Sequence, residues 1–203
     1  MTTHLYLSTD PQADELLARN PFALMVGMLL DQQISPWRPR SRARPNSDTR
    51  LGGLTPASVA GTDPEDFLAA FRETPAVHRF PGSMATRVQA LAQTLVDDYD
   101  GRAENVWTAP NADGTEPTGP QILRRLQALP GFGKQKAQIF LALLGKQFGL
   151  RADGWREAAG GYGPDDSLNS IADVRDAATM DRVRANKQAA KAAAKQAKAD
   201  AGR

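Results

Sequence analysis

The chain has 203 residues, of which 41% are hydrophobic and 24% charged, as in one ordinary soluble domain with or without a tail. It has no cysteine, which excludes disulfides, zinc–thiolate sites, iron–sulfur clusters and a thiol nucleophile. The two histidines, His4 and His78, lack metal-ligand spacing, so we expect neither a metal nor a cofactor. The longest apolar run, 22–30, is too short for a membrane span and no signal pattern precedes it, so we expect a cytoplasmic protein.

Charge is distributed unevenly, although the net charge is only +2. Segment 181–203 holds seven Lys or Arg against two Asp, and segment 37–50 holds five Arg against one Asp. The rest of the chain is therefore acidic overall. Two detachable basic segments are compatible with a nucleic-acid partner, although basic tails also keep proteins soluble.

The chain begins with two predicted helices. Asp10 and Pro11 are typical cap and first-turn residues and predict a helix over 10–19. The apolar run 22–30 predicts a buried helix rather than a strand, because Leu, Met and Ala predominate there over β-branched residues.

Three more helix starts follow before residue 101. Thr55 precedes a proline that opens the first of these helices. Thr62 and Glu65 have the spacing of a capping box for the second. Ser83 is the predicted N-cap of the third, which ends at Gly101.

The second half predicts a helix that ends at Pro130 and another over 135–148. Residues 151–170 are rich in glycine and predict irregular structure. No segment alternates as a strand does, so the predicted class is all-α. We expect one domain over 1–180 and a basic tail over 181–203 that is either a solvated helix or disordered.

The segment Leu129-Pro-Gly-Phe-Gly133 between these two helices carries the strongest functional signal. Its glycines allow a tight turn that points backbone amides outward, and the next helix adds the partial positive charge of its N-terminus. Lys134 and Lys136 add charge beside the turn. Such a turn suits a phosphate oxygen, bound without reading the base. The alternative is an ordinary helical hairpin.

Three motifs of this chain, the turn 129–133 and two segments that precede it, resemble the helix-hairpin-helix–GPD superfamily of DNA glycosylases, of the endonuclease III and AlkA type. Residues 129–133, with Ala137 after them, match its Leu-Pro-Gly-hydrophobic-Gly hairpin signature. The stretch from Asn20-Pro-Phe to Asp31-Gln-Gln is similar to its Asn-Pro-Phe…Leu-Leu-Ser-x-Gln pattern. Residues 83–91 are similar to the helix that precedes the hairpin. The resemblance is closest to a small actinobacterial branch of base-excision repair proteins.

The resemblance covers roughly residues 10–155 and implies a two-lobed helical fold that binds double-stranded DNA. Gln33 falls where the family inserts a glutamine into the space left by an extruded base, although it is equally a polar residue at a helix end. The other DNA-binding residues that the resemblance implies are Leu129, Pro130, Gly131, Phe132, Gly133, Lys134, Gln135 and Lys136.

Two positions bear on chemistry. Gln135 stands where bifunctional members have their lyase lysine, and because glutamine cannot form a Schiff base we expect no strand cleavage by that route. The family's essential aspartate falls on Asp153, where a carboxylate would position a water or stabilise an oxocarbenium-like sugar. Its neighbours lack the family's apolar lead-in and following arginine, so the alternative is a turn aspartate before Gly154.

The leading hypothesis is therefore a monofunctional DNA N-glycosylase that flips a damaged base and hydrolyses its glycosidic bond. We expect a monomer associated with the nucleoid. The second hypothesis is a non-catalytic DNA-binding or damage-sensing protein that keeps the hairpin but not the site. The third is a helical protein–protein module in which the hairpin is only a scaffold.

Residues 35–50 depart from the family pattern. Three prolines and five arginines stand where the branch has an apolar helix, and burying those arginines or breaking that helix costs several kcal/mol. Codons for Pro36 to Pro45 can be chosen so that a two-base shift reads Met-Ala-Ser-Ala-Phe-Ser-Gly-Pro-Thr, which is the family pattern. We hypothesise two compensating frameshifts, which resequencing the coding DNA would test. The alternative is a genuine basic insertion that contacts DNA.

The tail 181–203 is predicted to be a nonspecific electrostatic tether to DNA. Its seven cations would raise the affinity and steepen its salt dependence without affecting selectivity. Because the tail shows no apolar face, we expect its removal to leave the fold intact.

Overall fold

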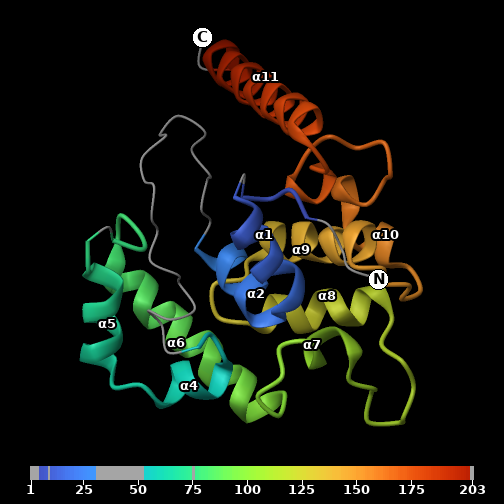
Figure 1. Cartoon of the computed structure of the whole chain (residues 1–203). Coiled ribbons are helices and arrows are strands. Elements are labelled where there is room, and N and C mark those ends of the chain that lie inside the picture. The colour runs from blue at the N-terminus through green and yellow to red at the C-terminus, as the bar shows by residue number, and fades with distance from the viewer. Residues whose placement is uncertain (1–4, 9, 31–52, 75, 202–203) are drawn as a thin grey trace.

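Figure 1 shows the computed structural model, which describes residues 5–8, 10–30, 53–74 and 76–201, with side chains up to residue 197. The predicted sites Gln33 and 35–50 lie outside the described residues. Every regular element in the described ranges is helical, which confirms the all-α class. The elements are α1 (Pro11–Arg19), α2 (Pro21–Leu29), α4 (Pro56–Gly61), α5 (Pro64–Arg72), α6 (Pro81–Asp98), α7 (Asn105–Thr108), α8 (Gly119–Ala128), α9 (Lys134–Gln147), α10 (Trp155–Ala158), the 3-10 turns η1 (Gly160–Tyr162) and η2 (Ile171–Asp173), and α11 (Ala177–Ala201).

Proline at the first helical position, preceded by a short polar cap, explains most helix starts in the first half. Asp10 caps α1 by accepting a hydrogen bond from the backbone N–H of Gln12 at 3.0 Å. Asn20 caps α2 in the same way, because its side-chain oxygen accepts a hydrogen bond from the backbone N–H of Ala23 at 3.0 Å. Both predicted helices are therefore confirmed.

Two predicted caps are wrong. α5 is capped by Asp63, whose carboxylate accepts from the backbone N–H of Glu65 at 2.8 Å, and not by a Thr62–Glu65 box. α6 begins at Pro81, so Ser83 lies inside its first turn and not at its N-cap. The reason is the same in both helices. A proline that occupies the first helical position leaves only the preceding residue as the N-cap.

Two groups of helices share one hydrophobic core. α4 and α5 pack on α6, while α8 packs on α9 and α2 also contacts α9 (Figure 1). The largest fully buried side chains come from both groups and are Met25, Leu29, Phe67, Phe71, Leu91, Leu95, Ile122, Leu126, Phe140, Leu141, Leu143 and Leu144. This shared core fixes α2, α8 and α9 relative to one another. No helix of the described residues is both long enough and apolar enough to cross a membrane.

The C-terminal region differs from its prediction. Residues 151–170 contain α10 and η1, where only irregular structure was expected. The tail does bury apolar side chains, because Val183 is 4% exposed and packs with Met180 and Val174 in a small second cluster. Asn186 also donates a side-chain hydrogen bond to the carbonyl of Leu168 at 3.2 Å. The expectation that 181–203 is dispensable for folding is therefore wrong for its first residues.

Two truncations test this boundary. Deleting residues 187–203 should leave the free energy of unfolding unchanged, because all described side chains from Lys187 onward are exposed. Deleting 181–203 should lower it by about 1.5 to 3 kcal/mol, the value of one buried valine side chain. Urea unfolding followed by circular dichroism measures both. Equal stabilities for the two truncated chains would contradict the docking of Val183.

Candidate nucleic-acid interface

The turn 129–133 is anchored in the core by its apolar side chains and exposes its glycines to solvent. Phe132 is 2% exposed and meets the ring of Phe140 edge-on, with the ring centroids 5.7 Å apart. Leu129 is buried beside it. Gly131 has a φ of +79°, a conformation that side chains other than glycine rarely adopt, and both glycines of the turn are exposed. The apolar members of the motif thus anchor the turn, and the glycines form its surface.

The N-terminus of α9 lies directly behind this turn. Gly133 is the N-cap, and no described side chain caps the helix. The backbone N–H groups of Lys134 and Gln135 have no acceptor among the described residues. A Cβ built on Gly133 would meet no atom within 4 Å, so another molecule can approach the backbone closely here. Unpaired amides at the positive end of a helix dipole form a good anion-binding surface.

The helical hairpin 119–147 carries five Lys or Arg and no Asp or Glu. Two of the cations stabilise the fold near this end. Arg125 donates to the carbonyl of Ala109 at 2.6 Å and holds the loop before α8. Lys136, expected to lie beside the turn as free charge, turns its ammonium to the carbonyl of Leu29 at 2.8 Å. Arg124 and Lys134 are exposed and remain available to an anionic ligand.

The end of α2 meets the hairpin at this point. The Lys136 ammonium binds the last carbonyl of α2, at Leu29. The side chain of Leu29 also fills the space in front of Gly131, so that a Cβ on Gly131 would overlap it. Two of the three motifs that carry the family resemblance, about a hundred residues apart in the chain, are therefore in contact. Gln33 follows soon after the end of α2 but lies outside the described residues.

Gln135 points from the first turn of α9 toward η1. Its side-chain amide donates to the Tyr162 hydroxyl at 2.9 Å. One turn further along, Gln138 donates to the carbonyl of Ala158 at 3.4 Å. Segment 158–162 is thus bound along the face of α9 next to the turn.

Asp153 lies away from this region. It is exposed, and its carbonyl accepts from the backbone N–H of Gly119 at 2.7 Å, at the first residue of α8. The turn begins after the last residue of α8, about 13.5 Å away at 1.5 Å per residue. Figure 1 shows α10, which follows Asp153, at the opposite end of the α8–α9 pair from the turn. The structure therefore does not bring Asp153 together with the hairpin residues.

One exposed aromatic side chain, Phe80, was not among the predicted site residues. Phe80 is 55% exposed, the largest exposure of a big hydrophobic side chain among the described residues. Arg79 places its guanidinium 4.8 Å from the centre of the Phe80 ring, and the His78 ring lies 6.0 Å away. An aromatic residue between a basic dipeptide and a proline that starts a helix was the available signal.

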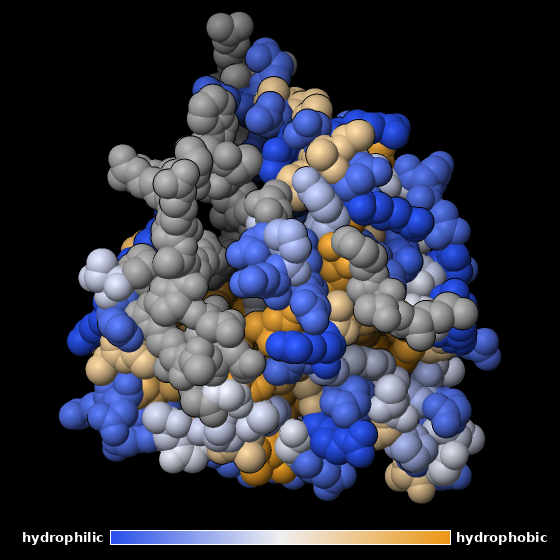
Figure 2. All heavy atoms as spheres, viewed as in Figure 1, coloured by the Kyte–Doolittle hydropathy of each residue, from blue (hydrophilic) through white to orange (hydrophobic). Residues whose placement is uncertain are grey.

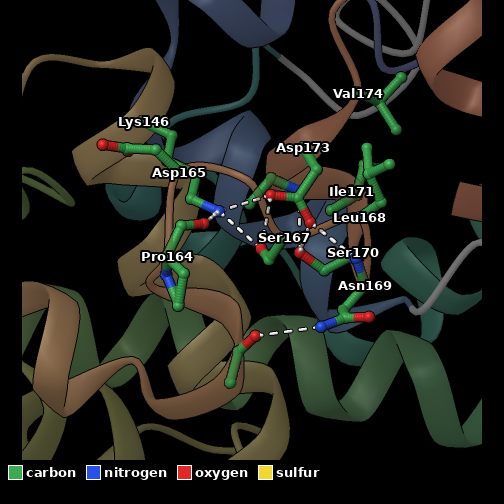
Figure 3. A network of polar contacts seen from close by, with 12 residues as sticks. Lys146, Pro164, Asp165, Ser167, Leu168, Asn169, Ser170, Ile171, Asp173 and Val174 are labelled. Atoms are coloured by element: carbon green, nitrogen blue, oxygen red, sulfur yellow. Dashed lines mark hydrogen bonds and ion pairs between the residues drawn. The ribbon is translucent and has the colours of Figure 1, made fainter.

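A buried polar network at the other end of α9 was also unforeseen. Figure 3 shows the Lys146 ammonium directed at the Asp173 carboxylate, 2.5 Å away, with both side chains at most 2% exposed. Lys146 also donates to the carbonyl of Pro164 at 2.6 Å and to the Ser167 hydroxyl at 2.9 Å. The second oxygen of Asp173 accepts from the backbone N–H groups of Asn169 and Ser170 at 2.9 and 3.0 Å. Because its charged groups are buried and hydrogen-bonded, this network is structural rather than catalytic.

The chain matches no protein-family model, no curated protein and no solved structure. In the described part of the chain, no group of three or more His, Asp or Glu side chains is placed to hold a metal ion. The case for the interface therefore rests on the turn, the open amides of α9 and the contact with α2.

Proposed function

We propose that this protein binds duplex DNA and acts in base excision, as a monofunctional DNA N-glycosylase that grips the phosphate backbone with the turn 129–133. The observation that carries the proposal is the contact between this turn and the end of α2 through Leu29, Gly131 and Lys136. Extruding a base costs unstacking energy, which a grip on the backbone beside the gap in the base stack would help to offset. In this chain, that residue would be Gln33, which follows α2.

The grip on the backbone would combine three contributions. The amides of Lys134 and Gln135 point to the place where a phosphate oxygen would sit, and Gly133 lets the strand come close. The exposed side chains of Arg124 and Lys134 add charge. None of these contacts reads a base, so they would hold any duplex equally.

Phe80 would supply a stacking surface for an unpaired or kinked base. Nucleobases stack on exposed aromatic rings without regard to sequence, because every base has a π-face. Arg79, whose guanidinium lies over the same ring, would face the neighbouring phosphate.

Replacing Phe80 with alanine should weaken duplex binding by about 1 to 3 kcal/mol, the usual value of one base–aromatic stack. The free energy of unfolding should hardly change, because the ring is more than half exposed. Fluorescence anisotropy with a labelled duplex measures the binding, and Phe80→Tyr, which keeps the ring, is the control. Equal affinities of the alanine and tyrosine variants would remove Phe80 from the interface.

Hydrolysis would follow base extrusion. A water oxygen bonds to C1′ of the sugar while the C1′–N bond breaks, and the base leaves with a proton. A carboxylate is needed to take the proton from water or to stabilise the cationic sugar, and Asp153 is the candidate for that role. Gln135 has no amine to form a Schiff base, so the product would be an intact abasic site.

The second candidate function is non-catalytic DNA binding or damage sensing. It is favoured by the distance between Asp153 and the turn along α8. A base released at the clamp would not reach a carboxylate at the far end of the same helix. The clamp would then serve recognition alone.

One screen separates the two functions. The purified protein is incubated with duplexes that carry alkylated, oxidised or deaminated bases, and alkali then reveals abasic sites as strand breaks. Base release by the parent that Asp153→Asn abolishes is the expected result. Release that survives in Asp153→Asn removes that residue as the catalyst. Duplex binding without release from any substrate supports the second function, and absence of duplex binding rejects both.

A further inference from the structure

α11 is a firmly rooted helix that leaves the body of the molecule. At its start, the Asp176 carboxylate accepts from the backbone N–H of Thr179 at 2.7 Å, and the Thr179 hydroxyl accepts from the N–H of Asp176 at 3.0 Å. The hydrogen bonds from Thr179 also lower the pKa of the Asp176 carboxyl. The buried Val183 and the bond from Asn186 to the body fix the next two turns. Figure 1 shows the rest of α11 projecting away from the other helices.

The projecting part needs no packing to stay helical. From residue 184 onward it consists almost entirely of Ala, Lys and Gln, which are strong helix formers. Figure 2 shows this region as hydrophilic side chains interspersed with the pale orange of alanine. It is therefore a stiff extension of the rooted part rather than a loose tail.

Its lysines form a row. Lys187, Lys191 and Lys195 are all exposed and four residues apart, which places them on one face of the helix at intervals of about 6 Å. No Asp or Glu occurs between Asp181 and Asp200. The opposite face, at Ala185, Ala189 and Ala193, carries only methyl groups. Because the root fixes the rotation of the helix, it also fixes the direction in which the row points.

We infer that this lysine row is a second DNA-backbone contact, an oriented arm that holds the same duplex as the hairpin; the inference rests on the proposed function. The chemistry of the helix selects this partner. A membrane-surface helix needs Trp, Phe or Leu to insert, and a protein interface is anchored mainly by buried aromatic and aliphatic side chains. Residues 184–201 contain no aromatic residue and no Leu, Ile, Val or Met. A polyanion requires only regularly spaced charges, since counterion release supplies the affinity.

Orientation distinguishes this arm from a loose tether. The variant K187A/K191A/K195A removes the row and keeps the helix. A transposed variant adds A185K/A189K/A193K to it, which restores the net charge but moves the row to the opposite face. An oriented arm loses affinity in both variants, whereas a loose tether loses it only in the first.

The experiment titrates a labelled duplex of unmodified sequence with the full chain at several salt concentrations. The first variant should bind about tenfold more weakly, and its plot of log affinity against log salt should be less steep by about 2 to 3, for three lost phosphate contacts. The transposed variant should bind nearly as weakly. Parental affinity in the transposed variant, or in both, would overturn the inference. The inference would also be overturned if the parent bound phosphatidylserine vesicles and the first variant lost this vesicle binding while keeping the parental affinity for the duplex.

The hairpin variant Gly133→Ala, titrated alongside, separates this inference from the proposed function. If only the arm variants lose duplex affinity, the result supports the arm as a DNA contact and contradicts the hairpin contact. If only Gly133→Ala loses duplex affinity, the result supports the hairpin contact and contradicts the arm. A parent that binds no duplex contradicts both.

Discussion

Replacing Asp173 with alanine is expected to lower the free energy of unfolding by about 3 to 5 kcal/mol, the usual cost of removing one partner from a buried ion pair. The Lys146 ammonium, 1% exposed, would be left without its counter-ion. The backbone N–H groups of Asn169 and Ser170 would lose their acceptor at the same time. Because these groups hold segment 164–174 against α9, the loss should loosen the whole C-terminal region.

Chemical denaturation followed by circular dichroism measures this effect. Asp165→Ala is the matched control, since Asp165 is also ion-paired, to Arg156 at 2.9 Å, but both side chains are about half exposed or more. An exposed pair contributes about 0 to 1 kcal/mol, so the control should unfold almost as the parent does. A loss below about 1 kcal/mol in Asp173→Ala would show that the network does not hold segment 164–174 against α9.

The two glycines of the turn should respond differently to alanine. Gly131→Ala places a side chain at a φ of +79° and against Leu29, which is itself buried, so we expect a loss of about 1 to 3 kcal/mol in stability. Gly133→Ala has a φ of −69° and open space around the new methyl group, so its stability should stay within about 0.5 kcal/mol of the parent. Gly131→Ala therefore changes the fold as well as any DNA contact, whereas Gly133→Ala does not.

Only Gly133→Ala tests the interface without disturbing the fold. The methyl group would stand between the amides of α9 and an approaching phosphate, and we expect duplex affinity to fall about three- to tenfold, as for the loss of one hydrogen bond. The fall should be equal on duplexes of different sequence, because the contact reads no base. Thermal unfolding provides the control. Unchanged affinity in a variant as stable as the parent would reduce the hairpin to a structural turn.

Local signals in the sequence predicted most of the helices. A proline after Asp10 or Asn20, and apolar residues every three to four positions, are short-range patterns that the structure confirms. The tight turn at Gly131 was also foreseeable, because two glycines after a proline permit few other structures. At both wrong caps a proline sets the helix start: α5 begins at Pro64 after Asp63, and α6 begins at Pro81 after Phe80, which makes no side-chain cap hydrogen bond.

Contacts between distant segments were beyond the reach of such signals. Lys136 was expected to be free charge, but its acceptor is 107 residues away in the chain. No local pattern links Lys146 with Asp173, because 27 residues separate the two in the chain and their pairing is made by tertiary packing. Asp153 was implied by the family resemblance, and its position relative to the turn depends on how the chain returns after α9. These cases are decided by tertiary packing, which periodicity does not encode.

α9 connects the two ends of the molecule as a single rod about 20 Å long. Its first turn lies behind the glycines of the hairpin, and its last turn, at Lys146 and Gln147, holds the segment that leads to α11. An insertion of one residue within α9 would rotate one end by about 100° against the other, while an insertion of four would nearly restore the phase. Length variation in this helix should therefore be tolerated in steps of whole turns, because the contacts at its two ends must keep their relative rotation.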